Sequence, residues 1–129
     1  MSTDSPYSFV PRRIEKPWGY ELIWAETERY VGKLLVVRAG QALSLQYHER
    51  KDESWLVQSG RASLELASVD APDVRHVIEI AADDAFRYRP GTIHRITAIE
   101  DTTILEVSTP DLDDVVRLDD RYGRPERDA

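Results

Sequence analysis

Residues 40–60 read GQALSLQYHERKDESWLVQSG and place an amide, an imidazole and a carboxylate within eight positions, at Gln46, His48 and Glu53. If a second strand follows the polar turn, Glu53 shares a face with Trp55. A carboxylate on an apolar face is costly to bury unless a positive group meets it. Gln46 and His48 lie one strand back and would meet it only through a shared cation or substrate. The pattern predicts a metal-binding hairpin in a β-fold, with simple hydrogen bonding among the three side chains as the alternative.

The first strand of this hairpin carries side chains of a kind that proteins bury on both of its faces. Because side chains alternate along a strand, one face is expected to hold Ser44, Gln46 and His48, and the other Leu43, Leu45 and Tyr47. A strand with two buried faces fits a two-layer barrel better than an open sheet.

The rest of the chain repeats short apolar or alternating segments separated by turn residues. Strands are expected at 20–24, 30–38, 61–67, 74–80, 86–88, 93–98 and 102–108. Residues 69–73, which include Pro72, are expected to form a turn. Helical periodicity is missing, and only residues 111–120 are a candidate for a short helix. The sequence therefore predicts an all-β protein built as one small β-barrel.

The composition limits the classes of protein to which the chain can belong. Its 129 residues suffice for one core and not for two, so we expect an arm at 1–13, one domain at 14–124 and a tail at 125–129. A net charge of -7 argues against nucleic acid as a partner. Without a signal peptide or an apolar span, we expect a cytoplasmic protein with no membrane partner. Because the chain has no cysteine, any metal needs nitrogen and oxygen ligands.

Two of the three histidines lie in glycine-bounded segments. His48 belongs to the hairpin, and His94 follows the turn residues Pro90 and Gly91 at the start of a predicted strand. His76 lies within another predicted strand without polar residues at ligand spacing, so we expect it to be structural or on the surface. His94 is thus a further candidate metal ligand.

The spacing of these residues resembles the two signatures of the cupin superfamily. The first signature is carried by Gly40, Gln46, His48, Glu53 and Gly60, with glutamine in the position of the first histidine. Gly91 and His94 match the core of the second signature. Four segments are similar to the type II mannose-6-phosphate isomerase group, a cupin also found fused to sugar-nucleotide transferases: KPWGYE at 16–21, LSLQYH at 43–48, GTIHRI at 91–96 and LEVSTPDLDDVVRLDDRYGR at 105–124.

This resemblance implies a double-stranded β-helix of the jelly-roll type with one divalent metal. The implied ligands are Gln46, His48, Glu53 and His94. Zinc is the expected ion, and manganese, iron or nickel would also suit two imidazoles, a carboxylate and an amide oxygen. The implied substrate is a sugar phosphate, and the implied reaction converts mannose 6-phosphate to fructose 6-phosphate.

An aldose–ketose isomerisation needs a base that moves a proton between two carbons and cationic groups that hold the phosphate. We expect Glu53 to be the base, with Glu106 as a weaker candidate. The expected phosphate ligands are Arg50, Lys51 and Arg95. Arg95 would point away from the metal face unless its strand bends at that position.

Lys51 and Ser54 stand where the group commonly has arginine and histidine, in the motif Arg-x-Glu-His-Trp, so the substrate does not follow from the motif. The alternatives are a non-catalytic cupin that binds a sugar or sugar nucleotide and, less favoured by the glutamine ligand, an iron-dependent oxygenase. We also expect a homodimer, in which an aromatic segment covers a strand edge of the neighbour. That segment contains Trp18, Tyr20 and Trp24.

Overall fold

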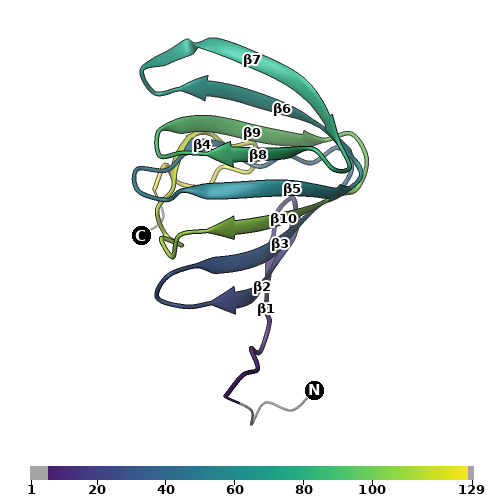
Figure 1. Cartoon of the computed structure of the whole chain (residues 1–129). Coiled ribbons are helices and arrows are strands. Elements are labelled where there is room, and N and C mark those ends of the chain that lie inside the picture. The colour runs from purple at the N-terminus through teal and green to yellow at the C-terminus, as the bar shows by residue number, and fades with distance from the viewer. Residues whose placement is uncertain (1–5, 128–129) are drawn as a thin grey trace.

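The computed structural model describes residues 6–127, and within them the chain forms strands and turns without a helix (Figure 1). The six-stranded sheet has, in spatial order, β1 (Arg12–Lys16), β2 (Gly19–Glu26), β3 (Val31–Val37), β10 (Thr102–Ser108), β5 (Glu53–Ser59) and β8 (Ala85–Tyr88). The five-stranded sheet has β11 (Val116–Asp119), β4 (Leu45–Tyr47), β9 (Thr92–Ala98), β6 (Arg61–Ser68) and β7 (Ala71–Ala81). Neighbouring strands are antiparallel. The predicted all-β, jelly-roll architecture is confirmed.

Along strands such as β5, the side chains that face the other sheet are buried, and the side chains between them are more exposed. In β5 the predicted shared face is confirmed, because Glu53, Trp55 and Val57 are all buried. The core joins both sheets, with Trp55 and Val57 of β5 in one cluster with Leu64 of β6 and Ile96 of β9. Burial of this apolar surface is the main favourable term in folding, at about 25 cal/mol per Å². The site described below lies at the edge of this core.

Two glycines fix the turns that place the ligand-bearing strands. Gly60, between β5 and β6, has a φ of 93°, and a Cβ there would lie 2.3 Å from the carbonyl oxygen of Asp101. Only glycine fits this close approach without strain. Gly91 has a φ of 84°, and its N–H donates to the carbonyl oxygen of His48 over 2.8 Å. This bond ties the turn before β9 to the end of β4.

Two expected segments have a different structure. Residues 111–120 were a candidate for a short helix, but β11 forms there and pairs with β4, with Val116 opposite Tyr47. The turn expected at 69–73 is shorter, because β7 already begins at Ala71. Pro72 is tolerated in β7 because this strand lies at the edge of its sheet, where a missing N–H costs no ladder bond.

Leu43 does not lie where strict alternation places it. It belongs to the main core cluster and borders the same cavity as Gln46 and His48, instead of facing away from them. The reason is that regular strand geometry in β4 begins only at Leu45, so alternation does not extend back to residue 43. Leu45 itself lies in a separate, smaller apolar cluster.

The remaining expectations concern the surface and the chain ends. His76 lies on β7, where Ile80 is the one buried residue, so its surface position is confirmed. Trp18 is buried in the core, whereas Trp24 is 44% exposed, and the expected dimer stays a prediction. Parts of the predicted arm and tail, residues 1–5 and 128–129, lie outside the described residues. Among residues 6–127, no helix is long and apolar enough to cross a membrane.

Candidate metal centre

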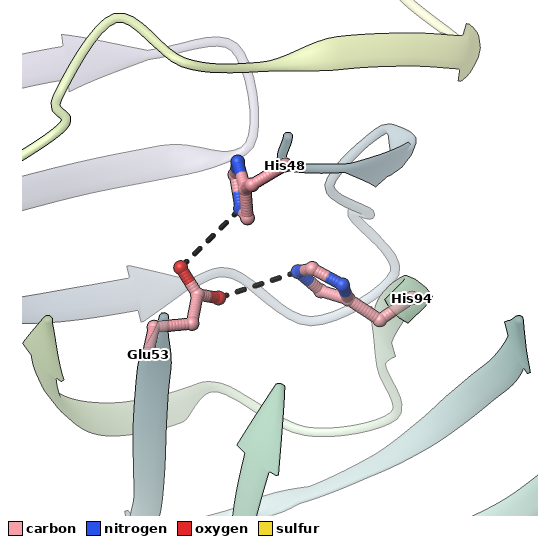
Figure 2. Close-up of side chains that lie close together, drawn as sticks. All are labelled: His48, Glu53 and His94. Carbon is pink, nitrogen blue, oxygen red and sulfur yellow. Dashed lines mark ion pairs between the residues drawn. The ribbon is translucent and has the colours of Figure 1, made fainter. Parts of the chain in front are cut away.

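Two imidazoles and a carboxylate meet between the sheets. His48 directly follows β4, His94 lies in β9 and Glu53 is the first residue of β5. β4 and β9 belong to the five-stranded sheet and β5 to the six-stranded sheet, so the three side chains come from opposite layers. Figure 2 shows both imidazole rings directed at the carboxylate of Glu53. The fold therefore brings together three of the four residues that the two sequence signatures predicted as metal ligands.

The distances within this group are short and symmetrical. His48 Nε2 lies 3.3 Å from Glu53 Oε2, and His94 Nε2 lies 3.3 Å from Glu53 Oε1. One ligand atom from each residue can be chosen so that all three lie within 4.8 Å of one another. Each residue is less than 5% exposed. Atoms this close can share one ion at the usual distances of about 2.0–2.2 Å.

Backbone carbonyls set the orientation of both rings. His48 Nδ1 contacts the carbonyl oxygen of Asp114, and His94 Nδ1 lies 2.9 Å from the carbonyl oxygen of Thr92. A carbonyl only accepts hydrogen bonds, so each Nδ1 carries the proton, and in a neutral ring Nε2 is the lone-pair nitrogen. Tyr88 also stacks on His94 with a centroid distance of 4.3 Å. Histidines that bind metals are commonly held in this way.

The orientation leaves two buried nitrogens without a hydrogen-bond partner among the described residues, namely Nε2 of His48 and Nε2 of His94. Buried polar groups in native proteins are nearly always paired. With neutral rings, the two lone pairs face the oxygens of Glu53, and a cation among them would remove the repulsion. With both rings protonated, the group would instead form two ion pairs. Two imidazoles and a carboxylate suit a divalent ion such as zinc.

Glu53 also meets a buried ammonium group. Lys51 Nζ lies 2.8 Å from Glu53 Oε2 and 3.2 Å from Glu106 Oε2. Burial raises the pKa of Glu53, but the attraction of Lys51 and the contacts with both imidazoles outweigh it and hold this pKa well below its ordinary value. Burial lowers the pKa of Lys51, but Glu106 and Glu53 outweigh it and raise this pKa. Both groups are therefore charged at neutral pH.

Lys51 and Glu53 end a row of alternating charges that crosses the inner side of the six-stranded sheet. We call this set the charge row: Lys16, Glu21, Lys33, Glu106, Lys51 and Glu53. Its consecutive oxygen–nitrogen distances, from Lys16 onward, are 3.7, 3.2, 3.6, 3.2 and 2.8 Å. Trp55 Nε1 donates to Glu106 Oε1 over 3.0 Å. Each carboxylate in the row is thus neutralised by a lysine.

A cavity of about 80 Å³ opens beside His48. Its charged and polar lining consists of Lys16, Glu21, Gln46, His48, Lys51, Arg117 and Arg124. Four of these side chains are cationic and one is a carboxylate, although the whole chain has a net charge of -7. The cavity is therefore suited to an anionic ligand.

The remaining predicted site residues have distinct positions. Gln46 lies in β4 opposite His94 and borders the cavity, and its Oε1 accepts a bond from Ser44 Oγ. Its role as a metal ligand stays a prediction. Arg50 is exposed, with its guanidinium 3.6 Å from Asp111.

Arg95 points away from the metal face, as expected for the residue after His94. Its guanidinium pairs with Glu65 of β6 and with Asp119 of β11. These ion pairs occupy the side chain, and its contact with a substrate phosphate stays a prediction that they disfavour.

Several residues of this region had no role in the sequence-based prediction. Glu21 and Lys33 of the charge row lie in strands whose pattern gave no sign of buried charge. Asp114 accepts hydrogen bonds from the main-chain N–H groups of Glu49, Arg50 and Lys51. It thereby shapes the turn between β4 and β5.

Arg117 and Arg124 line the cavity from the C-terminal segment. The sequence marked this segment by its resemblance to the isomerase group but did not place it near the metal ligands. Arg124 is anchored by two hydrogen bonds from its guanidinium to Asp120, 2.9 and 3.0 Å long.

Known proteins resemble this chain in sequence and in fold. Residues 6–120 match the family described as mannose-6-phosphate isomerase C-terminal. The mannose-1-phosphate guanylyltransferase ManC of Salmonella typhimurium is 31% identical over 120 residues, covering 88% of this chain and 23% of that protein. The chain therefore spans about a quarter of the length of this relative.

Solved structures with a similar fold include KdgF from Halomonas sp., with a TM-score of 0.65 and 22% identity over 77% of this chain and 87% of that one. A cupin superfamily protein from Desulfitobacterium hafniense DCB-2 has a TM-score of 0.59 and 18% identity, over 70% of this chain and 76% of that one. At such identities the likeness concerns the fold alone. Together with the matched family, it places the protein among the cupins, in the family of mannose-6-phosphate isomerase C-terminal domains.

Proposed function

We propose that this protein binds one divalent metal ion and interconverts the aldose and ketose forms of a phosphorylated sugar, as from mannose 6-phosphate to fructose 6-phosphate. The observation that carries the proposal is the pair of buried, unpartnered Nε2 atoms of His48 and His94 facing Glu53, next to a cavity with four cationic side chains. The matched family and the mannose-1-phosphate named for its relative support a phosphorylated sugar as substrate.

The proposed metal ligands are His48, Glu53 and His94, with Gln46 as the fourth. Zinc suits this set best, and manganese, iron and nickel are the alternatives. When bound, the ion would supply Lewis acidity that polarises a sugar oxygen. The protein contributes the fixed orientation of both imidazoles, through the carbonyls of Asp114 and Thr92.

Arg117 and Arg124 are the residues to which we assign the phosphate. Both line the cavity, and a guanidinium binds phosphate oxygens in bidentate geometry. The cavity volume of about 80 Å³ equals that of a few water molecules, so only the reacting end of a sugar would enter it. Phosphate binding at the rim then orients that end.

The proton transfer needs a carboxylate at the cavity. Glu53 was the expected base, but it is held by Lys51 and by two imidazoles. Glu106 is likewise held, by Lys51 and by Trp55. Glu21 is the carboxylate that borders the cavity, and we assign the proton transfer to it.

One observation favours a second candidate function, a cupin that binds a sugar or sugar nucleotide without turning it over. Glu21 lies 3.2 Å from Lys33 and 3.7 Å from Lys16, so ion pairs with two ammonium groups hold the carboxylate that would have to move the proton. A general base has to reach the proton that it takes up, and these ion pairs restrain Glu21. In addition, Ser54 stands where the group commonly has a titratable histidine.

Turnover distinguishes the two functions. The metal-loaded protein would be incubated with a panel of aldose 6-phosphates, and ketose formation followed by NMR. We expect mannose 6-phosphate to yield fructose 6-phosphate and His48→Ala to abolish it. Metal-loaded protein whose melting temperature rises with mannose 6-phosphate, but which forms no ketose, would establish the binding function instead. Metal-loaded protein with neither response would contradict both.

A further inference from the structure

The two oxygens of Glu53 have different neighbours. Oε1 lies 3.3 Å from His94 Nε2. Oε2 lies 3.3 Å from His48 Nε2 and also 2.8 Å from Lys51 Nζ. An ammonium group therefore competes with any metal for Oε2, while Oε1 has no such competitor among the described residues.

Lys51 is held in this position from its other side. Its side chain is buried, and Nζ lies 3.2 Å from Oε2 of Glu106. Glu106 is itself buried and fixed by the indole N–H of Trp55. If Lys51 turned away, two buried carboxylates would lose their closest cation, which is strongly unfavourable. Lys51 therefore stays against Glu53 when the site is filled.

The charges of the row are already balanced before any metal binds. Three lysines face three glutamates along the charge row. A divalent ion then brings two positive charges, and every carboxylate of the row already has a lysine partner. A charge buried without compensation is costly, so a ligand that carries negative charge is favoured at such an ion.

We propose that Lys51 determines which ligands the metal site accepts. It restricts Glu53 to one metal-binding oxygen and keeps the loaded site positively charged. The site therefore takes a ligand that coordinates through an anionic oxygen, such as a carboxylate, hydroxamate or enediolate, in preference to a neutral one. This inference rests on the metal binding of the proposed function. In physical terms, Lys51 weakens metal binding and strengthens anion binding.

The test uses a charge-neutral pair of substitutions, Lys51→Met with Glu106→Gln, which removes the ammonium together with one of its two carboxylate partners, so that Glu53 alone loses its cation. Cobalt(II) affinity is measured by titration calorimetry. Acetohydroxamate, an anionic ligand, and imidazole, a neutral one, are then titrated into the cobalt-loaded protein. We expect cobalt affinity to rise about ten- to a hundredfold, a typical size for changes beside a ligand. Although the net charge of the row does not change, acetohydroxamate affinity should fall about tenfold, because the ammonium that is lost contacts the metal ligand Glu53, whereas Glu106 contacts Lys33, Lys51 and Trp55 instead. Imidazole affinity should not change. The visible spectrum of cobalt reports any added ligand.

A single substitution, Glu106→Gln, should act in the opposite direction, because Lys51 then pairs with Glu53 alone and cobalt affinity falls. A control pair from an exposed ion pair outside the row, Arg61→Met with Glu79→Gln, should change cobalt affinity by less than about threefold, since neither residue contacts the charge row. If the Lys51 pair variant does not fold, an unchanged or higher cobalt affinity of Glu106→Gln overturns the inference.

The outcomes separate this inference from the function on which it rests. No cobalt binding by the unmodified protein would overturn both. Cobalt binding that is unchanged or weaker in the folded Lys51 pair variant would overturn the role of Lys51 alone. A parallel loss of acetohydroxamate and imidazole affinity would also overturn it, because a general disturbance of the site affects both ligands.

Discussion

Replacement of Asp114 by asparagine should destabilise the protein through the turn that connects β4 and β5. Its Oδ1 accepts from the N–H of Glu49 over 3.1 Å, and its Oδ2 accepts from the N–H groups of Arg50 and Lys51 over 2.6 and 2.8 Å. An asparagine has one acceptor oxygen, so one of these N–H groups would face an NH₂ group. The two remaining bonds would lose the assistance of the negative charge.

The magnitude follows from these three bonds. Losing one bond to a charged group costs about 1.5–3 kcal/mol, and weakening two others to neutral strength costs roughly 1 kcal/mol each. Glu49 and Arg50 are exposed, so water replaces part of this loss. We therefore expect the free energy of unfolding to fall by about 2–4 kcal/mol. This corresponds to about 8–16 °C in melting temperature at roughly 4 °C per kcal/mol for a chain of this size.

The contribution of Asp114 to the free energy of unfolding should also depend on pH. Burial raises the pKa of Asp114, but the three main-chain N–H groups outweigh it and lower this pKa below its ordinary value. Between the folded and the unfolded pKa, the unfolded state binds more protons, so stability rises with pH there. The contribution of Asp114 is complete above the unfolded pKa of roughly 3.9 and is lost as the pH falls through the lower folded pKa. The difference between wild type and variant should therefore shrink below about pH 4.

Urea unfolding at pH 7, 5 and 3 measures these differences. Asp113→Asn is the matched control, because the neighbouring aspartate is exposed, and it should change the free energy of unfolding by less than about 0.5 kcal/mol. If Asp114→Asn also stays within this range at pH 7, the carboxylate does not hold the turn and the reasoning fails.

Three further predictions concern the site and the surface. Glu53→Gln should remove most of the bound metal, because it replaces the charged ligand by a neutral one. Elemental analysis after metal loading and desalting measures the metal content, and an unchanged content would contradict this prediction. Arg124→Met should raise the KM or Kd for a phosphorylated sugar about ten- to a hundredfold while sparing metal content, since one charge-assisted contact is lost. The exposed Arg89→Met serves as its control, and equal effects of the two variants would refute a phosphate role. Trp24→Ser should weaken the expected homodimer, because this side chain is 44% exposed, and light scattering that gives a monomer mass for the wild type would refute the dimer.

Local patterns in the sequence predicted the strands and three members of the candidate site. The alternation in β5 placed Glu53 with Trp55 and Val57, and the short turn brought His48 near that face. Alternation depends only on neighbouring residues, so it is readable without knowledge of the partner strands. It failed at Leu43, where the chain is not yet in regular strand geometry, and at β11, where an acidic segment pairs with β4.

The charge row has no such local signature. Its members lie on β1, β2, β3 and β10, at the start of β5 and in the turn before it, and the β3 and β5 ends of the row meet only because β10 lies between β3 and β5. Glu106 pairs with Lys33 and Lys51 as a consequence of that topology. In the sequence Lys16, Glu21 and Lys33 read as ordinary solvated charges, because charged side chains are seldom buried.

The row also explains how an acidic chain forms a cavity suited to an anion. A surface excess of carboxylates sets the net charge of -7, but surface charges are screened over about 10 Å or less. Inside the barrel screening is weaker, so the local balance decides which ligand enters. There the carboxylates of the row are each matched by a lysine, and Arg117 and Arg124 also line the cavity, with Arg124 paired to Asp120. A bound divalent ion would add two positive charges to this balanced interior, so the metal ligands, the charge row and the cationic lining of the cavity all favour an anionic ligand, as the proposed function expects.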